Sequence, residues 1–231
     1  MNGINSKTDK INAVVTGVLF IIATIAGIIG LKLYDPILNH SDYLILGARN
    51  SNQIILGAAF ELILTCSAAG TGIMLYPYLR KFNESLGLGY VCFRMLEVVF
   101  ILIGIISVLA LLSLSHEFTN TDANTASFQT LGKILKAIHD WTFMLGPNFM
   151  LGVNTFIYSY VFYQSKLVPR KLSILGILGS VLIFAAALLE MFGIILQLSP
   201  SGILLAIPIA VYEMVLAIWL ILKGFNQENL T

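Results

Sequence analysis

The chain has 231 residues, of which 58% are apolar and 11% are charged, and its mean hydropathy is +0.89. A soluble domain is ordinarily about a quarter charged, so this chain has too few charges to cover a water-exposed surface. The composition excludes a disordered chain and a secreted disulfide scaffold, and the net charge of +1 excludes a nucleic-acid binder. It predicts a single domain, residues 1–231, embedded in the lipid bilayer.

Six apolar stretches are long enough to cross a hydrocarbon core of about 30 Å, because a helix rises about 1.5 Å per residue. Backbone polar groups in lipid must be satisfied within the segment, which favours helices over strands. We therefore predict an all-α bundle of six transmembrane helices. In chain order they cover about residues 11–34, 53–78, 86–114, 138–163, 172–196 and 203–222.

The two longer loops on the predicted outer side contain apolar residues of their own. One is 36–52, and the other, 127–137, has apolar residues at helical spacing beside Lys133 and Lys136. Both patterns predict short interfacial helices over the outer mouth of the bundle.

Basic residues in short loops indicate the orientation of membrane helices. Eight of them fall on the side of the two termini: Lys7, Lys10, Arg80, Lys81, Lys166, Arg170, Lys171 and Lys223. The opposite side carries Arg49, Lys133 and Lys136 among acidic residues. We predict that both termini are cytoplasmic and that the protein lies in the plasma membrane.

Ionisable residues within a membrane cost about 2.5–3.5 kcal/mol each at a helix centre, and they usually have a function. Seven ionisable residues and two asparagines lie in or at the edge of the apolar stretches: Glu61, Arg94, Glu97, His139, Asp140, Asn148, Asn154, Glu190 and Glu213. If the faces that carry them converge, they form a polar cavity open to the outer side. These nine residues are the candidate ligand-binding residues.

Simpler interpretations exist for several of these residues. Arg94 and Glu97 are three residues apart and can form an ion pair that only fixes helix packing. Asp140 can cap or solvate a helix end. Glu61, Glu190 and Glu213 have no partner close in sequence, which favours a functional role.

The fourth stretch is interrupted by Gly146-Pro147-Asn148. Proline removes one backbone hydrogen bond from a helix, and such a break can line a site. The three histidines, His40, His116 and His139, all fall on the outer side without the spacing of a metal site. The sequence identifies no catalytic residue, no metal ligand and no cofactor.

Several segments together resemble a known family. They are Phe93-Arg94-Met95-Leu96-Glu97, His139, the run from Gly146 to Gly152, Leu167-Val168-Pro169-Arg170-Lys171-Leu172 with Gly176, and Glu213 with the ending Ala217-Ile218-Trp219-Leu220-Ile221-Leu222-Lys223-Gly224. The chain is similar over nearly its whole length to the bacterial integral membrane proteins grouped as domain of unknown function 4386. The 167–172 loop and the 219–224 ending are the most specific pieces.

The resemblance implies a six-helix membrane domain in which Arg94, Glu97, His139 and Glu213 belong to the family pattern. Glu61 and Glu190 have no counterpart in that pattern. The resemblance implies no activity.

Our leading hypothesis is a non-enzymatic, transporter-like protein of the bacterial plasma membrane. It would bind or move a small polar or cationic ligand through an outward-facing cavity, because carboxylates outnumber cations in the helices. One alternative is an intramembrane enzyme acting on a lipid or isoprenoid near the outer leaflet, with His139 and Asp140 in acid/base or metal-binding roles. Another is an accessory protein whose buried charges only specify packing. The expected partners are the lipid bilayer and a small-molecule or lipid ligand, and the oligomeric state stays open.

Overall fold

The computed structural model describes residues 2–121 and 125–226, and these residues form helices and no strand. This confirms the all-α prediction. In chain order the elements are α1 (Asn2–Leu33), α2 (Asp35–Leu38), α3 (Tyr43–Arg49), α4 (Ser51–Phe82), α5 (Glu84–Asn120), α6 (Thr125–Phe143), the π-helix η1 (Met144–Met150), α7 (Leu151–Ser165), α8 (Arg170–Met191) and α9 (Pro200–Leu222).

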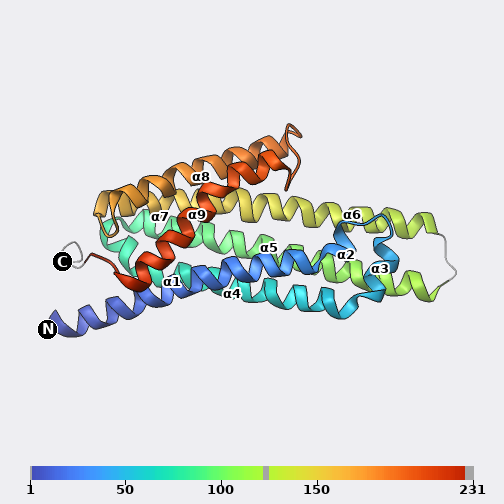
Figure 1. Ribbon diagram of the computed structural model, residues 1–231, viewed down its shortest axis with the longest axis horizontal. Helices are drawn as coiled ribbons and strands as arrows, with labels where there is room; N and C mark the ends of the chain where they lie inside the picture. Colours follow the sequence, from blue (N-terminus) through green and yellow to red (C-terminus); the bar gives the residue numbers. More distant parts are fainter. Residues whose placement is uncertain (1, 122–124, 227–231) are drawn as a thin grey trace.

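The long helices form a closed bundle. Each packs on the next in chain order, α1 on α4, α4 on α5, α5 on α7, α7 on α8 and α8 on α9, and α9 returns to pack on α1. Both termini lie at one end of the bundle, while α2, α3, the end of α5 and the start of α6 lie at the other (Figure 1). The eight basic residues that the sequence analysis assigned to one side therefore lie at the end of the bundle that also holds the termini.

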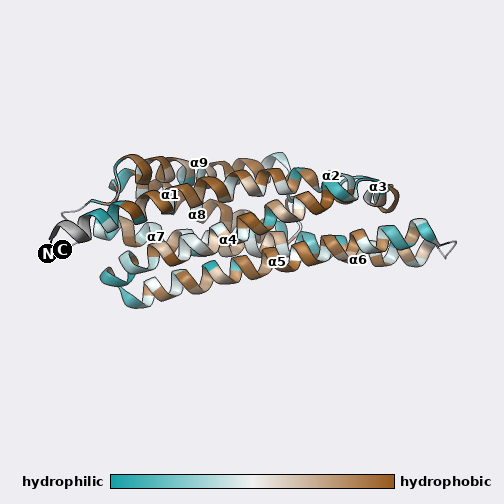
Figure 2. Cartoon of the chain, turned by 90° about the horizontal axis from the view of Figure 1, so that it is seen from below, coloured by the Kyte–Doolittle hydropathy of each residue, from teal (hydrophilic) through white to brown (hydrophobic). Residues whose placement is uncertain are grey.

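Within residues 2–121 and 125–226, five helices are long and apolar enough to cross a membrane: α1 over Lys7–Leu33, α4, α5, α8 and α9. Their apolar side chains point outward as well as inward, and Ile28, Ile106 and Leu204 are between 65% and 68% exposed. In Figure 2 the hydrophobic colour dominates the long helices and the hydrophilic colour gathers toward their ends. A protein that exposes so much apolar surface along its helices is embedded in a membrane.

The fourth predicted helix, 138–163, differs from a regular span. It is made of the end of α6, the π-helix η1 and α7, and Pro147 lies inside η1. Proline has no N–H and its ring clashes with the carbonyl four residues earlier, so a wider π turn accommodates it. The predicted break at residues 146–148 is therefore present, and α7 has only 15 residues.

Helix ends also differ from the predicted ones. The predicted helix 172–196 is too long, because α8 ends at Met191. The chain turns there through Gly193 (φ 67°) and Leu198 (φ 56°), and glycine adopts this left-handed conformation without strain. The hydroxyl of Ser199 then accepts a hydrogen bond from the Gly202 N–H at 3.3 Å and caps α9.

The two loops predicted to lie on the outer side are helical in different ways. Segment 36–52 contains α2 and α3, whereas segment 127–137 is no separate helix but part of α6, continuous with η1 and α7. The Tyr43 hydroxyl donates a hydrogen bond to the Gln129 carbonyl at 3.2 Å and thereby ties α3 to α6.

The described residues form three apolar core clusters, and a polar layer lies between the two larger ones. The cluster nearer the termini includes Tyr90, Tyr158 and Tyr212, and the cluster at the other end includes Ile54 and Ile105. Along α5 the residues between the clusters are Arg94 and Glu97, both buried. The bundle therefore encloses the charged side chains of Arg94 and Glu97 near the middle of its length.

Candidate functional site

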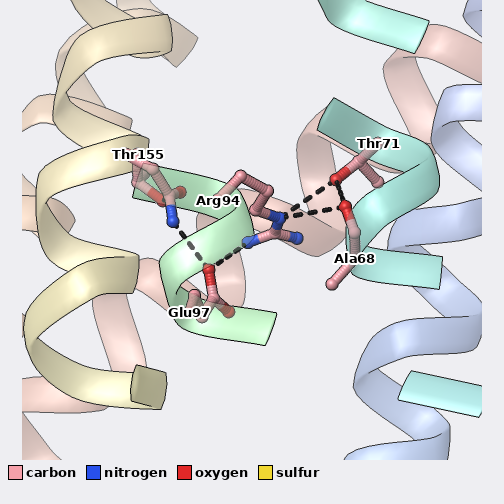
Figure 3. A network of polar contacts seen from close by, with 6 residues as sticks. Ala68, Thr71, Arg94, Glu97 and Thr155 are labelled. Atoms are coloured by element: carbon pink, nitrogen blue, oxygen red, sulfur yellow. Dashed lines mark hydrogen bonds and ion pairs between the residues drawn. The ribbon is translucent and has the colours of Figure 1, made fainter. Parts of the chain in front are cut away.

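Arg94 and Glu97 form a buried ion pair on α5. The Arg94 Nη1 lies 2.9 Å from Glu97 Oε2, and the two side chains are 3% and 6% exposed. Arg94 Nε also donates toward α4, to the Thr71 hydroxyl at 3.1 Å and the Ala68 carbonyl at 3.2 Å. Figure 3 shows Arg94 reaching from α5 toward the helix that carries Thr71 and Ala68.

The carboxylate of Glu97 is also bound from α7. Asn154 Nδ2 donates to Glu97 Oε2 at 2.6 Å, and Asn154 is completely buried. The guanidinium lies 5.8 Å from the centre of the Phe20 ring on α1. Four helices thus contribute to a network in which both charges have partners, as a buried ion pair requires.

Glu213 on α9 completes the polar layer. Its Oε1 atom is enclosed and accepts no hydrogen bond from any residue of the described part of the chain. The carboxyl group lies within electrostatic range of Arg94 and Glu97 without forming a direct ion pair. Glu213 is therefore the member of this layer with capacity for a further donor.

A second polar group lies at the α8–α9 turn, away from the termini. Asn148 Nδ2 in η1 donates to Glu190 Oε2 at 2.8 Å. Both residues line a cavity of about 230 Å³ between η1, α8 and α9, together with Gln197. The Gln197 Nε2 atom is enclosed and has no hydrogen-bond partner in residues 2–121 and 125–226.

Helix α9 connects this cavity to the polar layer. Ala206 and Ala210 line the cavity, and Glu213 follows Ala210 by three residues, or about 4.5 Å of helical rise. Pro208 lies within the same helix. Glu190 on α8 thus lies in the cavity wall, and Glu213 on α9 lies about one helical turn beyond the cavity lining.

His139 and Asp140 lie elsewhere, on α6. His139 is buried and meets the edge of the Tyr34 ring with centroids 6.1 Å apart. Its Nδ1 is 3.4 Å from Asp140 Oδ1, and the Asp140 side chain is 61% exposed. Because the Asp140 carboxylate is so exposed, water solvates it, and its ion pair with His139 is weak.

Glu61 on α4 packs against α1. A Cβ atom at Gly30 would lie 2.8 Å from the Glu61 side chain, so the absence of a side chain at residue 30 makes room for it. Glu61 lies within electrostatic range of Tyr34, whose ring contacts His139. Glu61 therefore belongs to the region around His139 and not to the region around Arg94. The nine candidate residues thus occupy three regions, around Arg94, Glu190 and His139.

Metal-ligating side chains do not cluster in the parts of the chain that the structure describes: no group of three or more His, Cys, Asp or Glu residues is close enough to hold an ion.

The family comparison includes all of these regions. A family model described as Domain of unknown function (DUF4386) matches residues 15–224. The chain belongs to this family. The resemblance inferred from the sequence is thereby confirmed, and the Arg94 network and the Glu190 cavity both lie within the DUF4386 domain. No curated protein and no solved structure matches the chain.

Two residues of the Arg94 network and the Glu190 cavity, Thr71 and Gln197, are absent from the sequence-based candidates. Thr71 lies among small residues of α4 that suggest close packing, and Gln197 follows the end of a predicted helix. The signal for Gln197 is an amide between apolar residues in 194–198. For Thr71 no local signal exists, because its role depends on the approach of Arg94 from α5.

Proposed function

We propose that this DUF4386 protein is a non-enzymatic membrane protein that binds a small cation with an apolar body in the Glu190 cavity. The observation that carries this proposal is a carboxylate, held by Asn148, in the wall of a cavity of about 230 Å³. The cavity lies away from the termini, on the side that we propose to be outside.

The chemistry of the lining favours a cation. Asn148 occupies Glu190 Oε2, and Oε1 has no hydrogen-bond partner among the described residues. A bound ammonium group can donate to Glu190 Oε1, and charge-assisted hydrogen bonds of this kind are about twice as strong as neutral ones. The unpartnered Gln197 Nε2 atom is a donor, so it does not contribute to the preference for an ammonium group.

The rest of the lining favours an apolar body. Phe143, Ile183, Ile203 and Ile207 surround the polar groups. An apolar cavity of about 150 Å³ is sufficient to bind benzene. A cavity of about 230 Å³ therefore accommodates a compact ring that carries an amine.

The Arg94 network supports a different role for the polar layer. Both charges have partners on α4 and α7, so we infer that this pair fixes helix packing. Glu213 is the deeper carboxylate to which a cation or proton entering from the cavity would pass. Movement of the ligand past this layer would be the transport form of the same function.

Calorimetric titration of the purified protein in detergent tests the binding. We expect benzylammonium to bind and benzyl alcohol, its neutral analogue, to bind at least about tenfold more weakly, since each factor of ten corresponds to about 1.4 kcal/mol. Glu190→Gln should lose the preference for the cation while it retains the melting temperature of the unsubstituted protein.

Glu84→Gln is the matched control, because Glu84 is an exposed carboxylate in the first turn of α5 at the opposite end. It should leave benzylammonium binding unchanged. Equal binding of amine and alcohol, or unchanged amine binding by the Glu190→Gln variant, would overturn the proposal.

We also propose that α6, η1 and α7 together complete a sixth span and that both termini are cytoplasmic. The support is the gathering of eight basic residues at the end of the termini. Single cysteines at Thr130 and Lys171, both exposed, can be introduced after Cys66 and Cys92 are replaced by alanine. In intact cells a membrane-impermeant maleimide should label T130C only. Labelling of K171C instead would show that the termini lie outside the cell and would contradict the proposed orientation.

A further inference from the structure

The two segments that are most specific in the family resemblance lie together in the folded protein. The loop 166–169 joins α7 to α8, and residues 219–226 include the end of α9 and the segment that follows it. The Asn226 backbone N–H donates to the Leu167 carbonyl at 2.9 Å. Both segments line one cavity of about 480 Å³ at the end of the bundle where the termini lie.

Buried residues fix the shape of this cavity. Leu167, Val168 and Phe225 are each 2% exposed. The Phe225 ring packs 4.3 Å from the Tyr78 ring, and Gly224 turns the chain toward it with a φ of 72°. The walls of the cavity are therefore anchored in the core and do not depend on surface side chains.

The charged groups of the lining have one sign. Lys166, Arg170 and Lys223 line the cavity, and its described lining residues include no carboxylate. The Arg170 guanidinium lies 5.2 Å from the centre of the Tyr163 ring, which holds it in place. Arg170 and Lys223 at one concave space favour an anion, and a phosphate group is an anion that arginine and lysine commonly bind in proteins.

An apolar stripe leads along α9 to the cavity. Val211, Val215, Ile218 and Leu222 recur at helical spacing and are between 44% and 71% exposed. Trp219 lines the cavity at the end of this stripe, and tryptophan favours the level of lipid headgroups. An acyl chain can therefore lie along α9 while its headgroup occupies the cavity.

We propose that this cavity binds the phosphate-bearing headgroup of an anionic membrane lipid, with Arg170 and Lys223 contacting the phosphate. The apolar stripe and the volume both favour a lipid over free phosphate, because a single phosphate ion would contact neither the stripe nor most of the cavity. The site is independent of the Glu190 cavity, which lies at the other end of α8 and α9.

Native mass spectrometry of the protein released from detergent with added lipid tests the site. The protein should retain phosphatidylglycerol in preference to phosphatidylcholine. The Arg170→Gln/Lys223→Gln variant should retain phosphatidylglycerol about 25-fold less, the product of about fivefold for each basic residue near anionic lipid. Arg170→Lys/Lys223→Arg, which keeps both charges, should retain it.

The matched control is Lys133→Gln/Lys136→Gln, which removes two charges from α6 at the opposite end. This variant should retain phosphatidylglycerol as the unsubstituted protein does. Equal retention of the two lipids, or equal losses in the two glutamine variants, would overturn the proposal. If inorganic phosphate released phosphatidylglycerol and sulfate did not, the cavity would be a site for free phosphate. That result would also overturn the proposal of a lipid site.

Discussion

Asn154 on α7 and Arg94 on α5 donate hydrogen bonds to the same oxygen, Glu97 Oε2, at 2.6 Å and 2.9 Å. The ion pair alone would lie within one helix and connect nothing. The amide of Asn154 converts it into a link between α5 and α7, and the contact of Arg94 with Thr71 extends the link to α4. The charges of the polar layer thus hold three helices in register.

Neutralising one partner of this pair should destabilise the protein strongly. Glu97→Gln removes the counter-charge that contacts the buried Arg94, and breaking a buried pair in this way costs about 3–5 kcal/mol. The double variant Arg94→Met/Glu97→Leu should lose much less than the sum of the single losses. Denaturant unfolding in mixed micelles measures this double-mutant cycle, and additive losses would contradict the packing role.

Adding a methyl group at Gly176 should disturb the contact among three helices. A Cβ atom there would clash with the Ser159 hydroxyl on α7 and the Tyr212 ring on α9. We expect Gly176→Ala to lower the free energy of unfolding by about 1–3 kcal/mol, the usual cost of overpacking. Gly89→Ala is the control, because its nearest neighbour would be Ile157 Cδ1 at 3.8 Å, and it should be neutral or stabilising. Equal stability of the two variants would contradict this account.

Removing the Tyr78 hydroxyl should loosen the start of α1. Tyr78 donates to Asp9 Oδ1 at 2.9 Å and accepts from Asn12 Nδ2 at 3.1 Å. Hydrogen bonds to charged groups contribute about 1.5–3 kcal/mol, so Tyr78→Phe should speed amide hydrogen exchange in the first turns of α1. Tyr76→Phe, whose ring faces Arg80, should leave that exchange unchanged. Unchanged exchange in the Tyr78→Phe variant would show that packing alone holds this end.

The carboxyl group of Asp35 should titrate below its usual value of 3.8. Hydrogen bonds from the Asn39 side chain and then from His40 favour the ionised form and lower the pKa of Asp35. The folded state is therefore stabilised above pH 3.8, and this contribution is lost as the pH falls through the lowered pKa. Asn39→Ala should move the pKa of Asp35 back toward 3.8, as followed by the ¹³C shift of its carboxyl carbon. An unchanged titration would rule out Asn39 as the main cause.

Helix-forming segments and their breaks could be predicted because they depend on local composition. The apolar stretches correspond to the long helices, and the interruption at Pro147 is present as η1. The pairing of Arg94 with Glu97 is equally local, since three residues along a helix place two side chains on one face. The predicted end of the fifth helix at residue 196 shows the limit of prediction from composition. The chain leaves the helix after Met191 and turns through Gly193, although the sequence stays apolar there.

Which polar residues meet could not be predicted in the same way. Asn148 and Asn154 are six residues apart in the sequence, yet one binds Glu190 on α8 and the other binds Glu97 on α5. The rotation of each helix about its axis decides such partners. That rotation is set by small residues such as Gly176 and Gly30, which allow close approach at particular points.

The sequence by itself determined that this protein lies in a membrane as a bundle of helices, with eight of its thirteen basic residues at the end of the bundle where the termini lie. Transfer of apolar side chains from water and the rise of a helix are properties of single segments, so composition and length are sufficient for these conclusions. Only the tertiary structure decided that the charges separate into distinct regions and that two distant segments enclose a basic cavity. Those arrangements depend on contacts between helices far apart in the chain, and no single segment contains them.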